Sequence, residues 1–234
     1  MNHRIFVADI PLEEGAIVAV SGEEQHHLTR VLRVREGETV ELFDAKGLST
    51  AARVLSVGKS ECSLEVLELV FSREAESSLT MAVALIQPEK FEFILQKCTE
   101  LGAAGFIPIL SDRTEITAER AEAKRDRWSK IILEAVKQSG RSLLPPLAAT
   151  MQFSELLARP DLVLFDADRT SSSGLVPAKA TLAIGPEGGW SEDELSDAAV
   201  RKVQFRRLGP RRLRAETAAI VALALLQGEL GELS

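Results

Sequence analysis

The chain has 234 residues, enough for one large domain or two smaller ones with a substantial hydrophobic core. Hydrophobic residues make up 45% and charged residues 27%, and the formal net charge of −7 is not that of a generally basic nucleic-acid-binding domain. Because the sequence has no long apolar run, no secretory signal pattern, only two cysteines and no zinc-type histidine spacing, we expect a cytoplasmic protein without a membrane segment or a metal site.

Residues 1–71 form the first predicted domain, which short alternating segments indicate to be rich in β-structure. Apolar and polar residues alternate in 39–43 and again in 52–57, with turn residues between them, so we expect a β-hairpin. A short helix is expected over 23–31, with Ser21 as its candidate cap.

Residues 72–78 are polar and without periodicity, which is typical of a linker, and residues 79–234 form the second predicted domain. In that domain, apolar runs alternate with segments of helical period. This order is typical of an α/β domain with a mostly parallel sheet. The strands are expected at 79–86, 106–110, 162–165, 181–184 and 203–208, and the helices at 91–101, 128–139, after Ser191 and at 215–227.

The last helix contains an uninterrupted apolar segment, 218–226, that is apolar all the way round. Such a helix needs burial on every side, either in a larger core or against a second subunit. We expect a symmetric homodimer.

Two loops rich in glycine and proline lie about twenty residues apart, at 185–189 and 208–214, each between an apolar run and a helix. Known phosphate-binding glycine motifs are missing, and backbone walls of this kind suit a flat, neutral ligand such as a purine. The alternative is an ordinary turn that needs glycine for its geometry alone.

Arginine is concentrated in two places, with five arginines in residues 206–214 and three more at Arg30, Arg33 and Arg35. Local basic clusters hold RNA phosphates even on an acidic protein, and binding is then sensitive to salt. The alternative is that these are solvated surface charges.

The two loops also carry sequence motifs that resemble a known family. Ile-Gly-Pro-Glu-Gly-Gly-Trp (184–190) and Leu-Gly-Pro-Arg-Arg-Leu-Arg-Ala-Glu-Thr-Ala (208–218) are similar to the signature pair of the RsmE family, the 16S ribosomal RNA uridine-N3 methyltransferases of the SPOUT superfamily. The resemblance extends over nearly the whole chain, through further motifs at 27–33, 96–102 and 127–141.

The resemblance implies a knotted α/β domain, preceded by a PUA-like β-barrel that helps to hold RNA. It also implies a homodimer and the cofactor S-adenosylmethionine, bound in the trefoil knot. The residues expected to bind the cofactor are Phe165, Asp166, Ile184, Gly185, Pro186, Glu187, Gly188, Gly189, Leu208, Gly209 and Leu213.

The expected reaction is methyl transfer to N3 of a uridine in 16S ribosomal RNA, held in an assembled 30S subunit. Arg214 is the expected catalytic residue, because a cation beside the uracil oxygens stabilises the anion that develops there. Glu216 either orients Arg214 or accepts the proton, or it only provides the carboxylate favoured in a helix first turn.

RNA contacts are expected from four arginines. Two other functions remain open, namely methylation of another RNA position, such as a ribose 2′-O or another base, and RNA binding without catalysis. The four arginines are Arg4, Arg30, Arg33 and Arg211.

Overall fold

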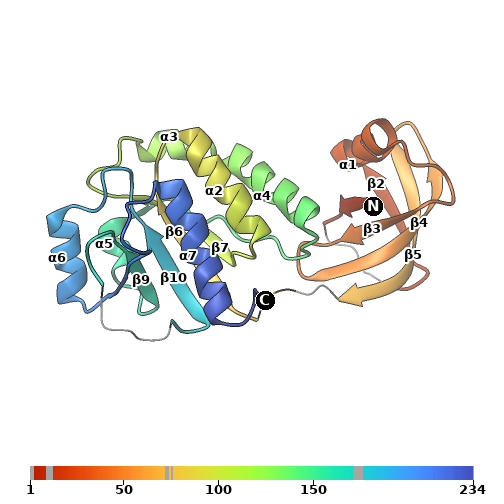
Figure 1. The fold of residues 1–234 in the computed structure, drawn as a ribbon. Coiled ribbons are helices and arrows are strands. Elements are labelled where there is room, and N and C mark those ends of the chain that lie inside the picture. Colours follow the sequence, from red (N-terminus) through yellow and green to blue (C-terminus); the bar gives the residue numbers. More distant parts are fainter. Residues whose placement is uncertain (1–2, 9–12, 72–73, 75, 171–175, 234) are drawn as a thin grey trace. The chain divides into compact units, whose positions relative to one another are not determined.

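The computed structural model describes residues 3–8, 13–71, 74, 76–170 and 176–233 (Figure 1). The chain divides into two compact units, one of Met1–Glu74 with Val136–Leu144 and one of Ala75–Ala135 with Pro145–Ser234. The first unit therefore includes a segment, 136–144, that the sequence analysis assigned to the second domain.

The first unit contains a five-stranded sheet in the order β1-β3-β4-β5-β2. The strand β1 is parallel to β3, the other pairs are antiparallel, and β3 and β4 form the predicted hairpin. Alternate residues of the strands, such as Val18, Leu42 and Leu64, make its buried core. The strands are β1 (Arg4–Phe6), β2 (Ile17–Ser21), β3 (Thr39–Phe43), β4 (Leu48–Val57) and β5 (Glu61–Phe71).

The predicted short helix is present as α1 (Gly22–His26) followed by a π-helix, η1 (His27–Leu32). Ser21 stands at the N-cap position, but its side chain makes no capping hydrogen bond, so the predicted capping role is wrong. Ser21 is also the last residue of β2, where it pairs with Glu61.

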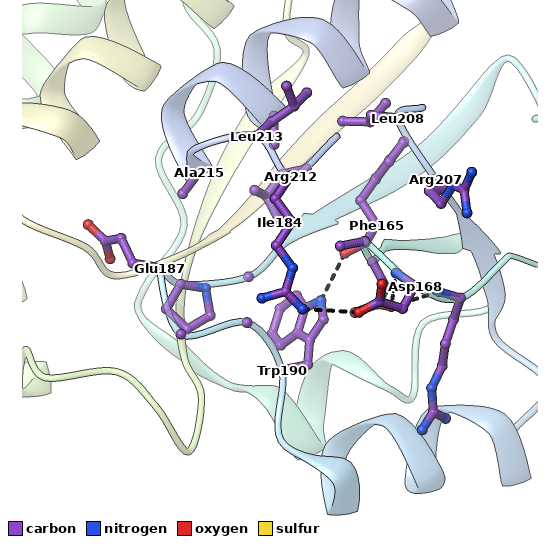
Figure 2. A pocket seen from close by; sticks show the side chains of 18 of the residues that line it. Phe165, Asp168, Ile184, Glu187, Trp190, Arg207, Leu208, Arg212, Leu213 and Ala215 are labelled. Carbon is purple, nitrogen blue, oxygen red and sulfur yellow. Dashed lines mark hydrogen bonds and ion pairs between the residues drawn. The ribbon is translucent and has the colours of Figure 1, made fainter. Parts of the chain in front are cut away.

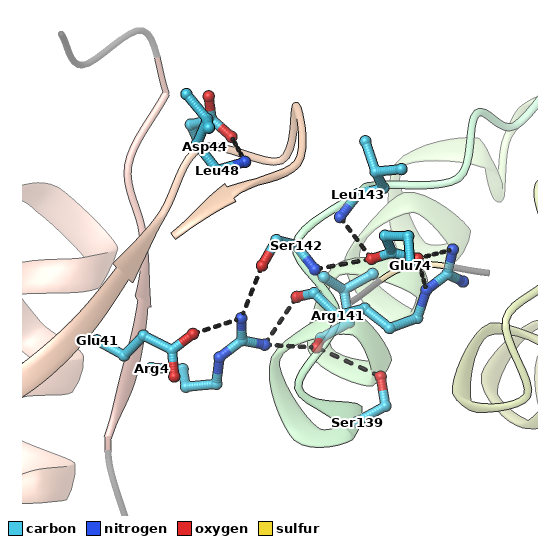
Figure 3. Close-up of polar contacts among 10 residues, drawn as sticks. Arg4, Glu41, Asp44, Leu48, Glu74, Ser139, Arg141, Ser142 and Leu143 are labelled. Atoms are coloured by element: carbon cyan, nitrogen blue, oxygen red, sulfur yellow. Dashed lines mark hydrogen bonds and ion pairs between the residues drawn. The ribbon is translucent and has the colours of Figure 1, made fainter. Parts of the chain in front are cut away.

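Arg4 connects the segment 136–144 to the rest of the first unit (Figure 3). The Arg4 guanidinium donates to the carbonyl oxygens of Val136 (3.1 Å) and Arg141 (2.7 Å). It also donates to Ser142 Oγ (3.2 Å) and pairs with Glu41 (2.9 Å), and its side chain is only 9% exposed. These partners give Arg4 a structural role within the unit, although its Nε has no hydrogen-bond partner, and its RNA contact stays a prediction.

Glu74, which lies within the predicted linker, also binds the segment 136–144 (Figure 3). One carboxylate oxygen accepts the backbone N–H groups of Ser142 and Leu143, both at 2.9 Å, and the other accepts Arg141 Nε at 3.0 Å. At least this part of the predicted linker thus has defined partners, whereas 72, 73 and 75 lie outside the described residues.

We expect Arg4→Ala to lower the free energy of unfolding of the first unit by about 3 kcal/mol, because it removes charged hydrogen bonds from a largely buried site. Arg30→Ala removes the same charge at an exposed position and is expected to change that free energy by less than about 0.5 kcal/mol. Urea unfolding followed by circular dichroism measures both changes. Equal stability of the two variants would contradict the structural role of Arg4.

The second unit is built on a six-stranded parallel sheet in the order β11-β9-β10-β6-β7-β8, which confirms the predicted α/β class. All of the strands expected from apolar runs are present, and β8 is an additional strand of two residues. The strands are β6 (Ser78–Ala84), β7 (Gly105–Leu110), β8 (Met151–Gln152), β9 (Leu162–Phe165), β10 (Lys179–Ile184) and β11 (Gln204–Arg206).

Helices cover both faces of this sheet (Figure 1). Residues of α2, α4 and α7 share one apolar core with one face, and residues of α5 and α6 share a second core with the other. The strands are thus buried on both sides, as their continuous apolar sequences indicate. The helices are α2 (Pro88–Glu100), α3 (Ala118–Glu122), α4 (Arg125–Ser139), α5 (Phe153–Leu156), α6 (Glu192–Val200) and α7 (Ala215–Glu229).

The helix α7 is only partly covered within this chain. Ala219, Ala222, Leu223 and Leu226 are buried against α2 and the sheet, whereas Leu225 is 52% exposed. The apolar segment 218–226 is therefore not buried on every side within the described residues. The predicted knot stays a prediction.

Candidate active site

A pocket of about 480 Å³ lies at the carboxyl edge of the parallel sheet (Figure 2). Three loops form most of it, each following one of the adjacent strands β9, β10 and β11. Ligands of open α/β sheets bind at this edge, where loops from neighbouring strands converge.

All eleven residues expected to bind the cofactor line this one pocket, although they come from three separate loops. Arg211 and Arg214 line it as well, but Glu216 does not. The location of the eleven residues in one pocket supports the prediction that they bind the cofactor, and the binding role of each residue remains a prediction. The pocket is also lined by polar residues for which the sequence predicts no role, including Arg113, Asp168, Arg169, Glu192, Arg207 and Arg212.

Trp190 fixes the loop after β10 against the loop after β9 (Figure 2). Its side chain is 3% exposed, and Nε1 donates to the Phe165 carbonyl oxygen at 3.0 Å. A Cβ atom on Gly185 would lie 3.1 Å from the indole ring, closer than real Cβ contacts normally come. Glycine at 185 therefore allows the close packing of Trp190, and glycine at 189, with φ at 71°, suits the turn.

The predicted capping box launches α6 from this loop. Ser191 Oγ accepts the Glu194 N–H at 3.1 Å, and Glu194 Oε2 accepts the Ser191 N–H at 2.8 Å. The other oxygen of Glu194 accepts the N–H of Asp112, in the loop after β7, at 3.0 Å. Burial raises the pKa of the Glu194 carboxyl, although backbone hydrogen bonds from Ser191 and Asp112 oppose the shift.

This raised pKa predicts a pH dependence of stability. A carboxyl whose pKa is higher in the folded state stabilises the fold fully below its unfolded pKa, and that contribution is lost as the pH rises through the folded value. Glu194→Gln keeps an acceptor for Ser191 but does not ionise. We therefore expect the stability of the wild type relative to this variant to fall as the pH rises above the ordinary glutamate value of about 4.3.

Urea unfolding of both proteins over a pH series measures the difference. Losing one acceptor for the Asp112 N–H adds an offset that does not depend on the Glu194 titration. Parallel pH profiles for the two proteins would show that Glu194 does not titrate with a raised pKa.

The loop after β9 is shaped by Asp166. Its Oδ1 accepts the backbone N–H groups of Asp168 (2.9 Å) and Arg169 (2.8 Å), a local turn typical of aspartate. Arg169 then pairs with Glu192 at 2.7 Å, and Asp168 pairs with Arg212 of the third loop at 3.1 Å (Figure 2). The loop after β11 is thus linked to the loop after β9 through a pair of exposed charged side chains.

Four other pocket arginines make no ion pair within the described residues, namely Arg113, Arg207, Arg211 and Arg214. All four are exposed, and Arg214 is the N-cap residue of α7. Glu216, in the first turn of that helix, has a buried Oε2 without a hydrogen-bond partner and no bond to Arg214. The pocket therefore holds cations that are available to an anionic ligand.

The remaining predicted RNA contacts, Arg30 and Arg33, lie in the first unit and are exposed. Arg33 follows η1 with a positive φ of 54°, a conformation uncommon for residues other than glycine. The described part of the chain shows no group of three His, Cys, Asp or Glu side chains that could hold a metal ion. It also contains no helix with the length and apolar character that crossing a membrane requires.

Comparisons with known proteins define the class of this site. The family model for the RNA methyltransferase domain matches residues 73–227, and the model for the RNA methyltransferase PUA domain matches residues 20–67. The pocket therefore belongs to an RNA methyltransferase domain, joined to a PUA domain.

Similar proteins narrow the class further. The ribosomal RNA small subunit methyltransferase E of Synechocystis sp. is 37% identical, with 98% of this chain and 78% of that protein covered, and that of Bacillus subtilis is 32% identical, with 92% and 91% covered. The chain belongs to the ribosomal RNA small subunit methyltransferase E family, which confirms the resemblance seen in its motifs.

Solved structures agree with the observed fold. The ribosomal RNA small subunit methyltransferase E of Neisseria gonorrhoeae, bound to S-adenosylmethionine, has a TM-score of 0.90 at 29% identity, and a putative methyltransferase of Legionella pneumophila, also with that cofactor, has a TM-score of 0.89 at 28% identity. In both cases 97% of this chain and 98% of the other are covered.

Proposed function

We propose that this protein transfers a methyl group from S-adenosylmethionine to N3 of a uridine in 16S ribosomal RNA. The observation that carries the proposal is the single pocket in which all eleven expected cofactor residues meet, in a chain whose relatives are small-subunit RNA methyltransferases. The cofactor-bound relatives support the choice of methyl donor.

The pocket fits S-adenosylmethionine in size and chemistry. Its volume lies in the range of about 300–1,000 Å³ usual for small-molecule sites. Phe165, Ile184, Leu208 and Leu213 provide apolar walls. The loop 185–189, called the glycine loop below, exposes backbone donors and acceptors for an adenine edge. When bound, this cofactor supplies a methyl group already activated by its sulfonium.

Arg214 is the catalytic residue of the proposal. Loss of the N3 proton leaves negative charge on the uracil oxygens, and an arginine without a carboxylate partner stabilises that charge. Glu216 does not line the pocket, so its place in the first turn of α7 favours the helix-terminus role over proton transfer.

RNA is held by Arg211 in the pocket and by Arg30 and Arg33 in the first unit. The net charge of −7 favours a structured target over nonspecific binding, so the substrate is an assembled 30S subunit. The uncovered side of α7, with Leu225 exposed, supports a homodimer. Relatives that are named for action on ribosomal RNA support a cytoplasmic location.

The test has two steps, both with the full chain. Isothermal titration with S-adenosylmethionine is expected to give saturable binding. Incubation with 30S subunits or with naked 16S ribosomal RNA, followed by mass spectrometry of nucleosides, is expected to yield 3-methyluridine mainly from subunits. A methylated ribose or another base would favour a different RNA position. Cofactor binding without any methylated product would favour RNA binding without catalysis.

A further inference from the structure

Arg113 enters the pocket from a different part of the chain. It follows β7 and alone among the pocket-lining residues precedes β9 in sequence. Its Nη1 donates to the Gly188 carbonyl oxygen at 2.6 Å, and its aliphatic stem lies 3.3 Å from where a Gly188 Cβ would be. The side chain is thus laid along the glycine loop.

The segment that carries Arg113 is itself held in place. The neighbouring Asp112 gives its backbone N–H to Glu194 at 3.0 Å, and its carboxylate accepts Ser191 Oγ at 2.5 Å. Both partners belong to the start of α6, directly after the glycine loop. A guanidinium positioned in this way loses little conformational entropy when it binds a ligand.

The charge of Arg113 is not neutralised by its partner. A carbonyl oxygen is uncharged, and no carboxylate pairs with this guanidinium within the described residues, whereas Arg169 and Arg212 each have one. Nε and Nη2 make no hydrogen bond in the described part of the chain, so N–H donors remain for a ligand. The proposed cofactor carries a positively charged sulfonium, and the Arg113 guanidinium would repel it unless the guanidinium also bound an anion.

We propose that Arg113 is an anion-binding residue of the pocket, which receives the charged oxygens of either an RNA phosphate or the carboxylate of the cofactor. Guanidinium groups bind both kinds of oxygen through paired N–H donors. The inference rests on the proposed function, because it assumes that the pocket takes the cofactor and an RNA.

The experiment compares wild type with Arg113→Ala, Arg113→Lys and Arg120→Ala, in which the last removes the same charge from an exposed position on α3 outside the pocket. Isothermal titration uses S-adenosylhomocysteine, which has the amino-acid carboxylate, and 5′-methylthioadenosine, which lacks it. Binding to 30S subunits, the proposed substrate, is measured by co-sedimentation between about 50 and 200 mM salt.

If the ligand is the carboxylate, Arg113→Ala weakens S-adenosylhomocysteine about 10–100-fold and leaves 5′-methylthioadenosine unchanged. If it is an RNA phosphate, cofactor binding is unchanged, binding to 30S subunits weakens, and the salt slope falls by about one. In either case Arg113→Lys recovers part of the loss and Arg120→Ala shows none.

Two results would overturn the inference. Equal weakening of both nucleosides would mean that Arg113 only supports the glycine loop, and wild-type behaviour of Arg113→Ala in all assays would mean that it binds no anion. Failure of the wild type itself to bind S-adenosylhomocysteine would instead count against the proposed function.

Discussion

Replacing Arg214 with alanine is expected to lower kcat for methylation of 30S subunits by about 10²–10³-fold, the usual effect of removing one preorganised donor from a developing anion. The affinity for S-adenosylmethionine is expected to stay within about twofold, because the cofactor is assigned to the loop backbones and apolar walls. Arg214 lies at the entrance to α7, is exposed, and has no carboxylate partner within the described residues.

Single-turnover methylation with saturating cofactor measures this effect, and titration calorimetry measures the affinity. Arg211→Ala is the matched control, since it removes an equal charge three residues away and is expected to raise KM for the subunit more than it lowers kcat. The catalytic assignment would be wrong if Arg214→Ala lowered cofactor affinity and left single-turnover rates unchanged.

Much of the second unit could be predicted from sequence because its signals are local. Continuous apolar runs identified the strands, and the capping box at Ser191 located the start of α6. The loops 185–189 and 208–214 follow strands of one parallel sheet, and the topology of such a sheet brings them to one edge. Local patterns and general topology therefore sufficed to indicate the pocket.

Contacts between distant residues were the part that sequence did not reveal. Arg4 is separated from Val136 and Arg141 by more than 130 positions, and nothing in its neighbourhood distinguishes a buried structural arginine from an RNA contact. Arg113 was missed for the same reason, because its partner Gly188 lies 75 residues away. The capping prediction for Ser21 rested on residue type alone, and residue type does not fix the direction of the hydroxyl group.

Gly185→Val is expected to weaken S-adenosylmethionine binding about 10–100-fold and to lower the free energy of unfolding by about 1–3 kcal/mol. The added Cβ lies 3.1 Å from the indole ring of Trp190, which is held by a hydrogen bond to the Phe165 carbonyl oxygen and packs 4.7 Å from the ring of Phe153. Because these contacts restrain the ring, we expect the larger valine side chain to displace the loop 185–189, which forms one wall of the pocket.

The size of this effect should follow the size of the side chain, with Gly185→Ala weaker than Gly185→Val in both calorimetric and unfolding measurements. Gly228→Ala, in α7 and with open space around its Cβ position, is the matched control and is expected to keep full cofactor affinity. Its stability should stay the same or rise slightly, because alanine has a higher helix propensity than glycine. A folded Gly185→Val protein with wild-type cofactor affinity would contradict the expected displacement of this pocket wall.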